Sequence, residues 1–236
     1  MNMRKLLLVS IAAIVLSASL NACGKKLPDP VERKDGYAWI PIADTAFLVP
    51  EKTWLKGYGR KATDGSIDSF DLHVTAPDVQ PWSPAVNEQM YPALGPGKRV
   101  DVVVRKDSNL LAGQYEYFYR PPQSRWGGML DEVESDQQVN GLRKFRDPIM
   151  SQTTIYEHIE NDRVKYFIYC DEDNDPPQRQ FCHLSFPWNK AIYVELTFTR
   201  NYLPNTIRMA EKITEKLKEF EAAGHAYQLK LPSNQN

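Results

Sequence analysis

The sequence predicts an α+β fold, in which a mostly antiparallel β-sheet, with a meander in its C-terminal half, carries an amphipathic C-terminal helix packed on it. Three observations support this. Apolar and polar residues alternate over several segments, as in strands with one buried face. Asn140-Gly141 is a favoured two-residue hairpin connection. The last apolar pattern, 201–223, repeats every three or four residues. With 236 residues, 42% hydrophobic and 25% charged, the chain is long enough to bury a core.

The first half of the chain has two alternating segments separated by a proline-rich one. Segment 66–75 places apolar residues in a strand-like run, and 99–105 alternates valines with mostly charged residues. Between them, 76–98 holds five prolines, which predicts a long irregular segment, either a functional loop or a locally packed one. Trp82 in this segment is expected to pack against the sheet, and the alternative is an apolar anchor for a protein partner.

The second half is predicted to be an antiparallel meander. After the hairpin at Asn140-Gly141, four successive strands are expected at 153–159, 163–170, 181–186 and 191–199. In the last of these, every even position from Ile192 to Phe198 is apolar, whereas the odd positions include Glu195 and two threonines. This alternation is typical of a sheet with one buried and one half-exposed face.

An amphipathic helix is predicted over 201–223. Pro204 suits its first turn, where the missing N–H costs nothing, and Gly224 suits the position just past its end. The opposite side carries charges of alternating sign and is expected to face solvent. The apolar positions are Ile207, Ala210, Ile213, Leu217 and Phe220.

The N-terminus has the features of an export signal. Arg4 and Lys5 precede 6–20, which is almost entirely apolar or small. As a helix this stretch would span about 22 Å, less than the roughly 30 Å hydrocarbon core of a bilayer, so a removed signal peptide is favoured over a permanent span. The stretch ends in LNAC, residues 20–23, which resembles the lipobox of bacterial lipoproteins.

This resemblance implies a lipid-anchored protein of the bacterial cell envelope. In bacterial lipoproteins the cysteine thiol, here Cys23, receives a diacylglyceryl group, the preceding peptide is removed and the new amino terminus is acylated, with palmitate as an expected chain. Two or more chains, at about 0.8 kcal/mol per buried methylene, anchor a protein stably. Gly24 replaces the Asp that retains lipoproteins in the inner membrane, which favours the outer membrane, facing the periplasm. The expected organisation is a signal peptide (1–22), a lipidated tether (23–36) and a periplasmic α+β domain (37–236), either undivided or with two sheet-rich halves (37–120 and 121–236).

Cys170 and Cys182 are predicted to form a disulfide. The periplasm is oxidising, so paired cysteines there are read as a structural bond. If 164–170 and 181–186 are adjacent strands, both cysteines face the apolar side of the sheet. Closing a loop of about 13 residues would stabilise the fold by about 3 kcal/mol through the unfolded chain.

The acidic residues that follow Cys170 do not form an EF-hand. A calcium loop starting at Asp171 needs Gly at its sixth position and Glu at its twelfth, where this chain has Pro176 and Cys182. The carboxylates are therefore expected to be solvated turn residues, and the alternative is a surface that faces a basic patch of a partner. That alternative involves Asp171, Glu172, Asp173 and Asp175.

The sequence predicts no catalytic residue, metal ligand or cofactor. A formal charge of -1 without a long Lys/Arg run argues against nucleic-acid binding. No G-x-S-x-G or S-x-x-K motif is present, and the four histidines lack the spacing of zinc ligands. We therefore expect a binding protein whose partners are the membrane, through the lipid anchor, and another protein.

A second resemblance indicates which kind of protein that partner is. The segments AFLVPEKTWLKGY (46–58), APDVQP (76–81) and GLRKFR (141–146), followed by two cysteines and the amphipathic helix, are similar to periplasmic immunity lipoproteins that neutralise lipase effectors of type VI secretion. The family implies an α+β fold, no catalysis, and inhibition by loops that cover the toxin's active site. The alternatives are a structural or assembly lipoprotein of the envelope, or a lipid- or sugar-acting enzyme.

Overall fold

The computed structural model describes residues 31–61, 66–90, 92, 97–106, 134–139, 141–146, 153–161, 163–171 and 179–228. The segment predicted to hold the signal peptide and Cys23 lies outside these residues, as do Glu172, Asp173 and Asp175. Within the described ranges, no helix is both long and apolar enough to cross a membrane.

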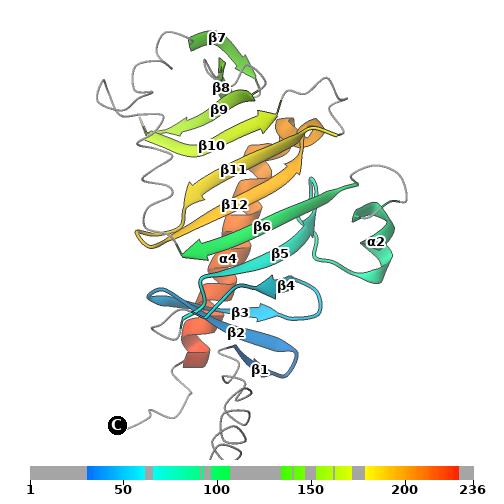
Figure 1. Cartoon of the computed structure of the whole chain (residues 1–236), viewed down its shortest axis with the longest axis vertical. Coiled ribbons are helices and arrows are strands. Elements are labelled where there is room, and N and C mark those ends of the chain that lie inside the picture. Colours follow the sequence, from blue (N-terminus) through cyan, green and yellow to red (C-terminus); the bar gives the residue numbers. More distant parts are fainter. Residues whose placement is uncertain are drawn as a thin grey trace, which may run out of the picture.

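In the described part of the chain, twelve strands form two antiparallel sheets that share one long C-terminal helix (Figure 1). The strands are β1 (Glu32–Lys34), β2 (Tyr37–Ile42), β3 (Thr45–Pro50), β4 (Leu55–Tyr58), β5 (Ser69–Thr75), β6 (Arg99–Lys106), β7 (Glu134–Val139), β8 (Leu142–Arg146), β9 (Thr153–Glu160), β10 (Arg163–Asp171), β11 (Phe181–Pro187) and β12 (Ile192–Thr199). The helices are α2 (Pro84–Met90), the 3-10 helix η1 (Arg200–Asn205) and α4 (Thr206–Gln228).

The larger sheet has the strand order β4-β5-β6-β12-β11-β10-β9-β8-β7. From β7 to β12, consecutive strands are antiparallel neighbours, so the predicted C-terminal meander is confirmed. Val139 pairs with Leu142, and Gly141 has a φ of 78°, as the predicted hairpin requires. The last strand, β12, then pairs with β6, where Leu196 lies opposite Val102 and joins the early strands to the meander.

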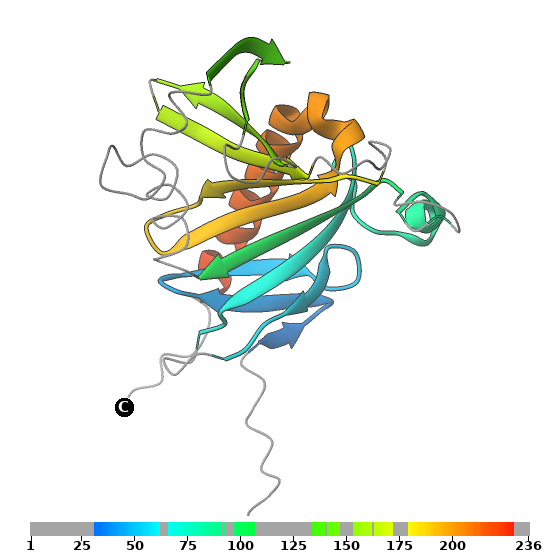
Figure 2. The same ribbon diagram turned by 45° about the horizontal axis from the view of Figure 1, so that its top comes forward.

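One face of this sheet is covered by α4 (Figures 1 and 2). Alternation within the strands places a row of apolar residues there: Phe70, Val104 and Val194 are paired across β5, β6 and β12, and all three are buried. Each fully buried side chain of this size contributes roughly 1.5–3 kcal/mol. Of the predicted helix positions, Ala210, Ile213, Leu217 and Phe220 are buried in the same core, and Ile207 is partly buried against it. Met209, which was not predicted, is also buried there.

The smaller sheet, in the order β1-β2-β3, packs on the C-terminal part of α4. Phe47 and Val49 of β3 are buried in the same core as the helix residues. On β2, the Trp39 indole donates a hydrogen bond to the Gly224 carbonyl at 3.3 Å. The two sheets are thus both attached to α4.

The helix differs from its prediction at both ends. Pro204 lies inside η1, immediately before α4, and not in the first turn of α4. The prediction that Gly224 lies just past the helix end is wrong, because α4 continues to Gln228 and Gly224 is buried within it. A Cβ at Gly224 would lie 2.3 Å from the Ala46 carbonyl oxygen, so glycine here permits close approach of helix and strand.

The proline-rich segment 76–98 is not wholly irregular as predicted, because it contains α2. Pro84 takes the first position of this helix, where a missing N–H is harmless. The helix is held in place at its end, where Met90 is only 1% exposed and the Lys98 N–H donates to the Gln89 carbonyl at 2.7 Å. Figure 1 shows α2 beside the sheet, next to β5 and β6.

Candidate functional site

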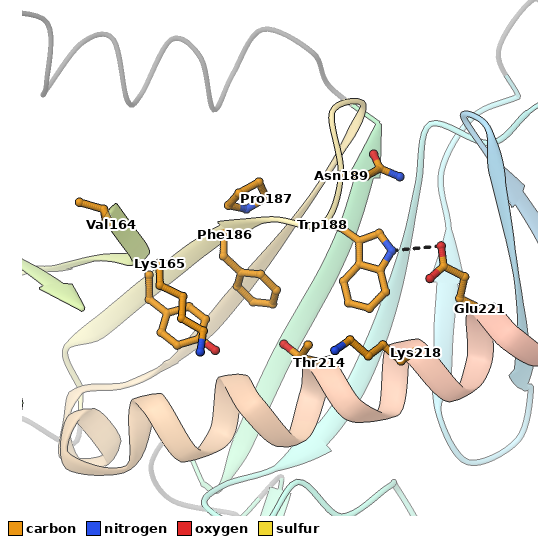
Figure 3. A pocket seen from close by; sticks show the side chains of 10 residues that line it. Val164, Lys165, Phe186, Pro187, Trp188, Asn189, Thr214, Lys218 and Glu221 are labelled. Atoms are coloured by element: carbon orange, nitrogen blue, oxygen red, sulfur yellow. Dashed lines mark hydrogen bonds between the residues drawn. The ribbon is translucent and has the colours of Figure 1, made fainter. Parts of the chain in front are cut away.

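A groove lies between α4 and one end of β10 and β11 (Figure 3). Its volume is about 520 Å³, within the range of binding pockets in proteins. The helix contributes Thr214, Lys218 and Glu221, which lie on one side of α4 because they are four and three residues apart. The strands and the turn after β11 contribute Val164, Lys165, Tyr166, Phe186, Pro187, Trp188 and Asn189.

Three aromatic side chains line the groove, namely Tyr166, Phe186 and Trp188, and Figure 3 shows the last two. Tyr166 and Phe186 are buried, and their rings meet edge to face with centroids 5.5 Å apart. Trp188 is half-buried in the turn that joins β11 to β12, where its backbone N–H donates to the Ile192 carbonyl at 2.9 Å. The sheet therefore positions Tyr166 and Phe186, and the turn positions the backbone of Trp188.

A strand irregularity explains how three consecutive residues reach the groove. In a regular strand, neighbouring side chains point to opposite faces. The pairing of β10 with β9 shifts register between Val164 and Tyr166, which is a bulge that re-aims the side chains around it. Val164, Lys165 and Tyr166 consequently all line the cavity.

Glu221 joins the polar side of the groove to the rest of the fold. Its Oε1 accepts hydrogen bonds from Trp188 Nε1 at 3.3 Å and from Thr45 Oγ1 at 2.8 Å (Figure 3 shows the first). The same Thr45 hydroxyl lies 3.1 Å from His225 Nε2. One carboxylate thus connects α4, β3 and the turn after β11, and it orients the Trp188 ring.

Two lysines bring positive charge to the groove. Lys165 Nζ lies 3.1 Å from Glu160 Oε1 and 5.2 Å from the centre of the Tyr166 ring. Burial alone would lower the pKa of Lys165, but the hydrogen bond to Glu160, together with the nearby Tyr166, Glu160 and Glu211, outweighs it, and the pKa of Lys165 is raised. Lys218 extends toward Thr214 within the groove (Figure 3). Among the described residues, no carboxylate lies within ion-pair distance of the Lys218 ammonium.

These groups suit a ligand that carries a negative charge beside an apolar group. The aromatic rings offer the apolar contact, and the two ammonium groups offer the charge. The Thr214 hydroxyl is already engaged, because it donates to the Ala210 carbonyl at 2.8 Å. No group of three or more potential metal ligands occurs within the described ranges. The groove therefore combines an aromatic surface with positive charge.

A second polar cluster lies on the face of the large sheet opposite α4. Tyr169 and His183 stack with centroids 4.6 Å apart, and His183 Nδ1 lies 3.5 Å from Glu195 Oε1 and 3.1 Å from Thr197 Oγ1. The hydrogen bond from His183 lowers the pKa of Glu195 in spite of burial. Glu157, in the same cross-strand row as Glu195, is buried, and burial raises its pKa to about 7. The polar groups of His183, Glu195 and Thr197 thus interact with one another. Glu157 Oε1, in contrast, has no hydrogen-bond partner among the described residues.

The cysteines predicted to pair are joined by a disulfide. Cys170 and Cys182 lie directly opposite each other in β10 and β11, and both are buried in the core on the α4 side. Asp171 ends β10 and is half-buried, next to the disulfide. The other predicted partner-binding carboxylates and the predicted lipidation site lie outside the described residues.

Trp82 lies apart from both the groove and the disulfide. Its backbone N–H donates to the Thr53 carbonyl at 2.9 Å and its indole Nε1 to Asn87 Oδ1 at 3.1 Å. The ring is half-buried, and the apolar core formed by the described residues does not include it. The structure does not bring Trp82 and Asp171 together, since β11, β12 and β6 separate β10 from β5, beside which Trp82 lies.

The sequence reasoning missed the groove. The helix face expected to meet solvent includes Glu215 and Glu219, which are exposed, but Lys218 and Glu221, which line the groove, received no role from the sequence. The available signal was weak: a polar stripe at positions 214, 218 and 221, and an exposed-looking Trp188 in a turn. Only the tertiary fold brings the stripe and the tryptophan together.

Comparisons with known proteins give one informative likeness. No protein-family model matches the chain, and no curated protein matches it. A solved structure that it resembles is Smlt3025, described as an immunity protein of the Stenotrophomonas maltophilia type IV secretion system. The TM-score is 0.53 at 15% sequence identity, over 80% of this chain and 98% of that chain. At this identity the likeness is one of fold, and it extends over nearly all of the Stenotrophomonas protein.

Proposed function

We propose that this chain is an immunity protein, a non-catalytic protein that binds and neutralises a toxic effector delivered by a bacterial secretion system. The fold shared with nearly the whole of the Stenotrophomonas immunity protein carries the proposal. A protein that inhibits by binding gains from a rigid surface, because ordering costs subtract from affinity. The core shared by α4 and both sheets, and the Cys170–Cys182 disulfide, provide such a scaffold.

The proposal places the protein on the outer membrane, facing the periplasm, anchored through Cys23. The lipobox-like residues 20–23 support the anchor, and a structural disulfide suits an oxidising compartment. Replacing the thiol in Cys23→Ser removes the acylation site. We expect this variant to lose metabolic labelling with palmitate and to leave the membrane fraction; labelling equal to that of the unaltered protein would contradict the anchor.

The effector is proposed to be a lipase, as the resemblance to lipase-immunity lipoproteins implies. That resemblance points to type VI secretion, whereas the Stenotrophomonas protein belongs to a type IV system. Attacker strains that lack one or the other apparatus distinguish the two routes. Phospholipid hydrolysis by the purified effector, with and without the purified domain, tests the activity that is neutralised.

The central experiment directs the product of the neighbouring gene to the periplasm of a laboratory bacterium. Cells that also export this protein should grow, and cells without it should lyse or stop dividing. A version lacking the export signal, residues 1–22, is the control and should not protect. Equal toxicity with and without the exported protein would contradict the immunity function. A structural or assembly role would instead show as an envelope defect on deletion in a strain that lacks the effector gene.

Trp82 and the carboxylates of Asp171, Glu172, Asp173 and Asp175 are proposed as further contacts with the effector. Neutral amides in place of these four acids should weaken binding without changing stability if they face a basic patch. If neither binding nor stability changes, the acids are solvated turn residues and not contacts.

A further inference from the structure

The groove beside α4 is a fixed surface whose parts come from three regions of the fold. The Trp188 ring is held by Glu221, which also binds Thr45 of β3. The Tyr166 ring contacts two other rings. Phe186 meets it edge to face, and the His158 ring stacks on it at a centroid distance of 5.6 Å. A partner that binds here does not have to order these side chains, which preserves affinity.

The charges around the groove are not balanced. The Glu221 carboxylate accepts hydrogen bonds from Trp188 and Thr45, and the Lys165 ammonium forms an ion pair with Glu160. Lys218 has no carboxylate within ion-pair distance among the described residues, although its side chain extends into the groove (Figure 3). An occupant therefore gains from a negative charge placed near Lys218 and an apolar group on the Tyr166 and Phe186 rings.

The openness of the groove favours a protein segment over a free small molecule. Pro187, Asn189 and Lys218 are exposed along its rim. Small-molecule pockets bury most of the ligand's surface, and a rim this exposed cannot do so alone. A protein partner covers the rim with its own surface, and Trp188 and Tyr166, which line the groove, are of the residue types that most often dominate protein interfaces.

We propose that this groove is the docking site for the effector, and that the docking segment carries an Asp or Glu side chain next to an apolar one. The acidic group binds Lys218, and the apolar side chain lies on the aromatic rings. This inference rests on the proposed immunity function, and it assigns a binding site and a partner chemistry to that function.

The test measures the affinity of the purified effector for variants of the exported domain. Lys218→Glu should weaken binding at least tenfold, because it replaces attraction with repulsion. Thr214→Trp should abolish binding by filling the groove. Lys190→Glu is the matched control: it makes the same charge change at an exposed lysine that does not line the groove, and it should alter affinity less than twofold. Circular dichroism and the unfolding midpoint establish that each variant is folded.

Cell protection and crosslinking complete the test. Lys218→Glu and Thr214→Trp should fail to protect cells, and Lys190→Glu should protect them. A photo-crosslinking residue at Asn189 should capture an effector peptide that contains Asp or Glu.

Two outcomes would overturn the docking site alone. One is full binding and protection by both groove variants in cells that the unaltered protein protects. The other is a Lys218-dependent complex with dodecanoate that leaves effector affinity unchanged, which would make the occupant a fatty acid. Failure of the unaltered protein to bind the effector would overturn the immunity function as well.

Discussion

Gly224 in α4 lies directly against Ala46 in β3. A methyl group on Gly224 would be 2.3 Å from the Ala46 carbonyl oxygen, which is backbone and cannot swing aside like a side chain. At the same contact, the Trp39 indole donates to the Gly224 carbonyl. Glycine therefore lets helix and strand approach at main-chain distance, and this contact seats the small sheet on α4.

We expect Gly224→Ala to destabilise the protein. Inside a helix the change normally stabilises by roughly 0.5–1 kcal/mol, but overpacking at a tight contact costs about 1–3 kcal/mol and outweighs it. Urea unfolding monitored by circular dichroism measures the difference. In the control, Ala222→Gly at an exposed position of the same turn, only helix propensity is lost. A Gly224→Ala variant as stable as the unaltered protein would show that the helix can move away from β3.

The disulfide between Cys170 and Cys182 closes a short loop, with a sequence separation of 12. Replacing both cysteines by alanine should lower the free energy of unfolding by about 3 kcal/mol, mainly because the unfolded chain gains freedom. The urea midpoint with and without reductant gives an independent measurement. Reductant should lower the midpoint of the unaltered protein and leave that of the double variant unchanged. A midpoint that reductant does not move would contradict a stabilising bond.

Glu157 is a buried carboxylate that lowers stability at neutral pH. It is 1% exposed, and its Oε1 has no hydrogen-bond partner among the described residues. Burial raises its pKa from 4.5 to about 7. The folded state holds the proton more tightly than the unfolded chain does. The stabilising contribution of this group is therefore complete below about pH 4.5 and is lost as the pH rises through about 7.

Glu157→Gln keeps the shape of the side chain and removes its ionisation. We expect the variant to match the unaltered protein near pH 4.5 and to exceed its free energy of unfolding by up to about 3 kcal/mol at pH 8. Urea unfolding across this range tests the expectation. The same change at exposed Glu215 should not alter the pH dependence. Parallel curves for the Glu157→Gln variant and the unaltered protein would show that Glu157 is ionised without cost.

The strands could be predicted from the sequence because their patterns are local. Alternation over 99–105 or 191–199 reports directly which face of a strand is buried, and the structure places β6 and β12 there. The end of the helix could not be predicted in the same way. A glycine at position 224 is typical of a helix end. Here, however, the glycine is needed for close packing against Ala46, and the helix continues to Gln228.

The helix α2 and the groove were also not predicted from the sequence. Five prolines in 76–98 indicated an irregular segment, but Pro84 stands where a helix tolerates proline, so α2 forms. The groove depends on Lys165, which a bulge re-aims, and on Trp188, which a turn brings over the helix. Neither a bulge nor a contact between a turn and a distant helix has a periodic signature.

Glu221 connects the Trp188 wall of the groove to α4 and β3. Its Oε1 accepts hydrogen bonds from Trp188 and Thr45, so Glu221→Leu leaves two donors without this acceptor and should cost about 2 kcal/mol. Glu221→Gln keeps an oxygen in place and should cost less than about 1 kcal/mol. Urea unfolding measures both values, and the NMR shift of the Trp188 indole N–H reports the local change.

The same pair of variants links stability to binding. Because the Trp188 ring forms one wall of the groove, releasing it in Glu221→Leu should weaken effector binding more than Glu221→Gln does. Glu215→Leu removes an exposed carboxylate that does not line the groove and should leave binding unchanged. Equal affinities for the Leu and Gln variants would mean that the Trp188 wall keeps its position without Glu221, and that the turn backbone alone is sufficient to hold it.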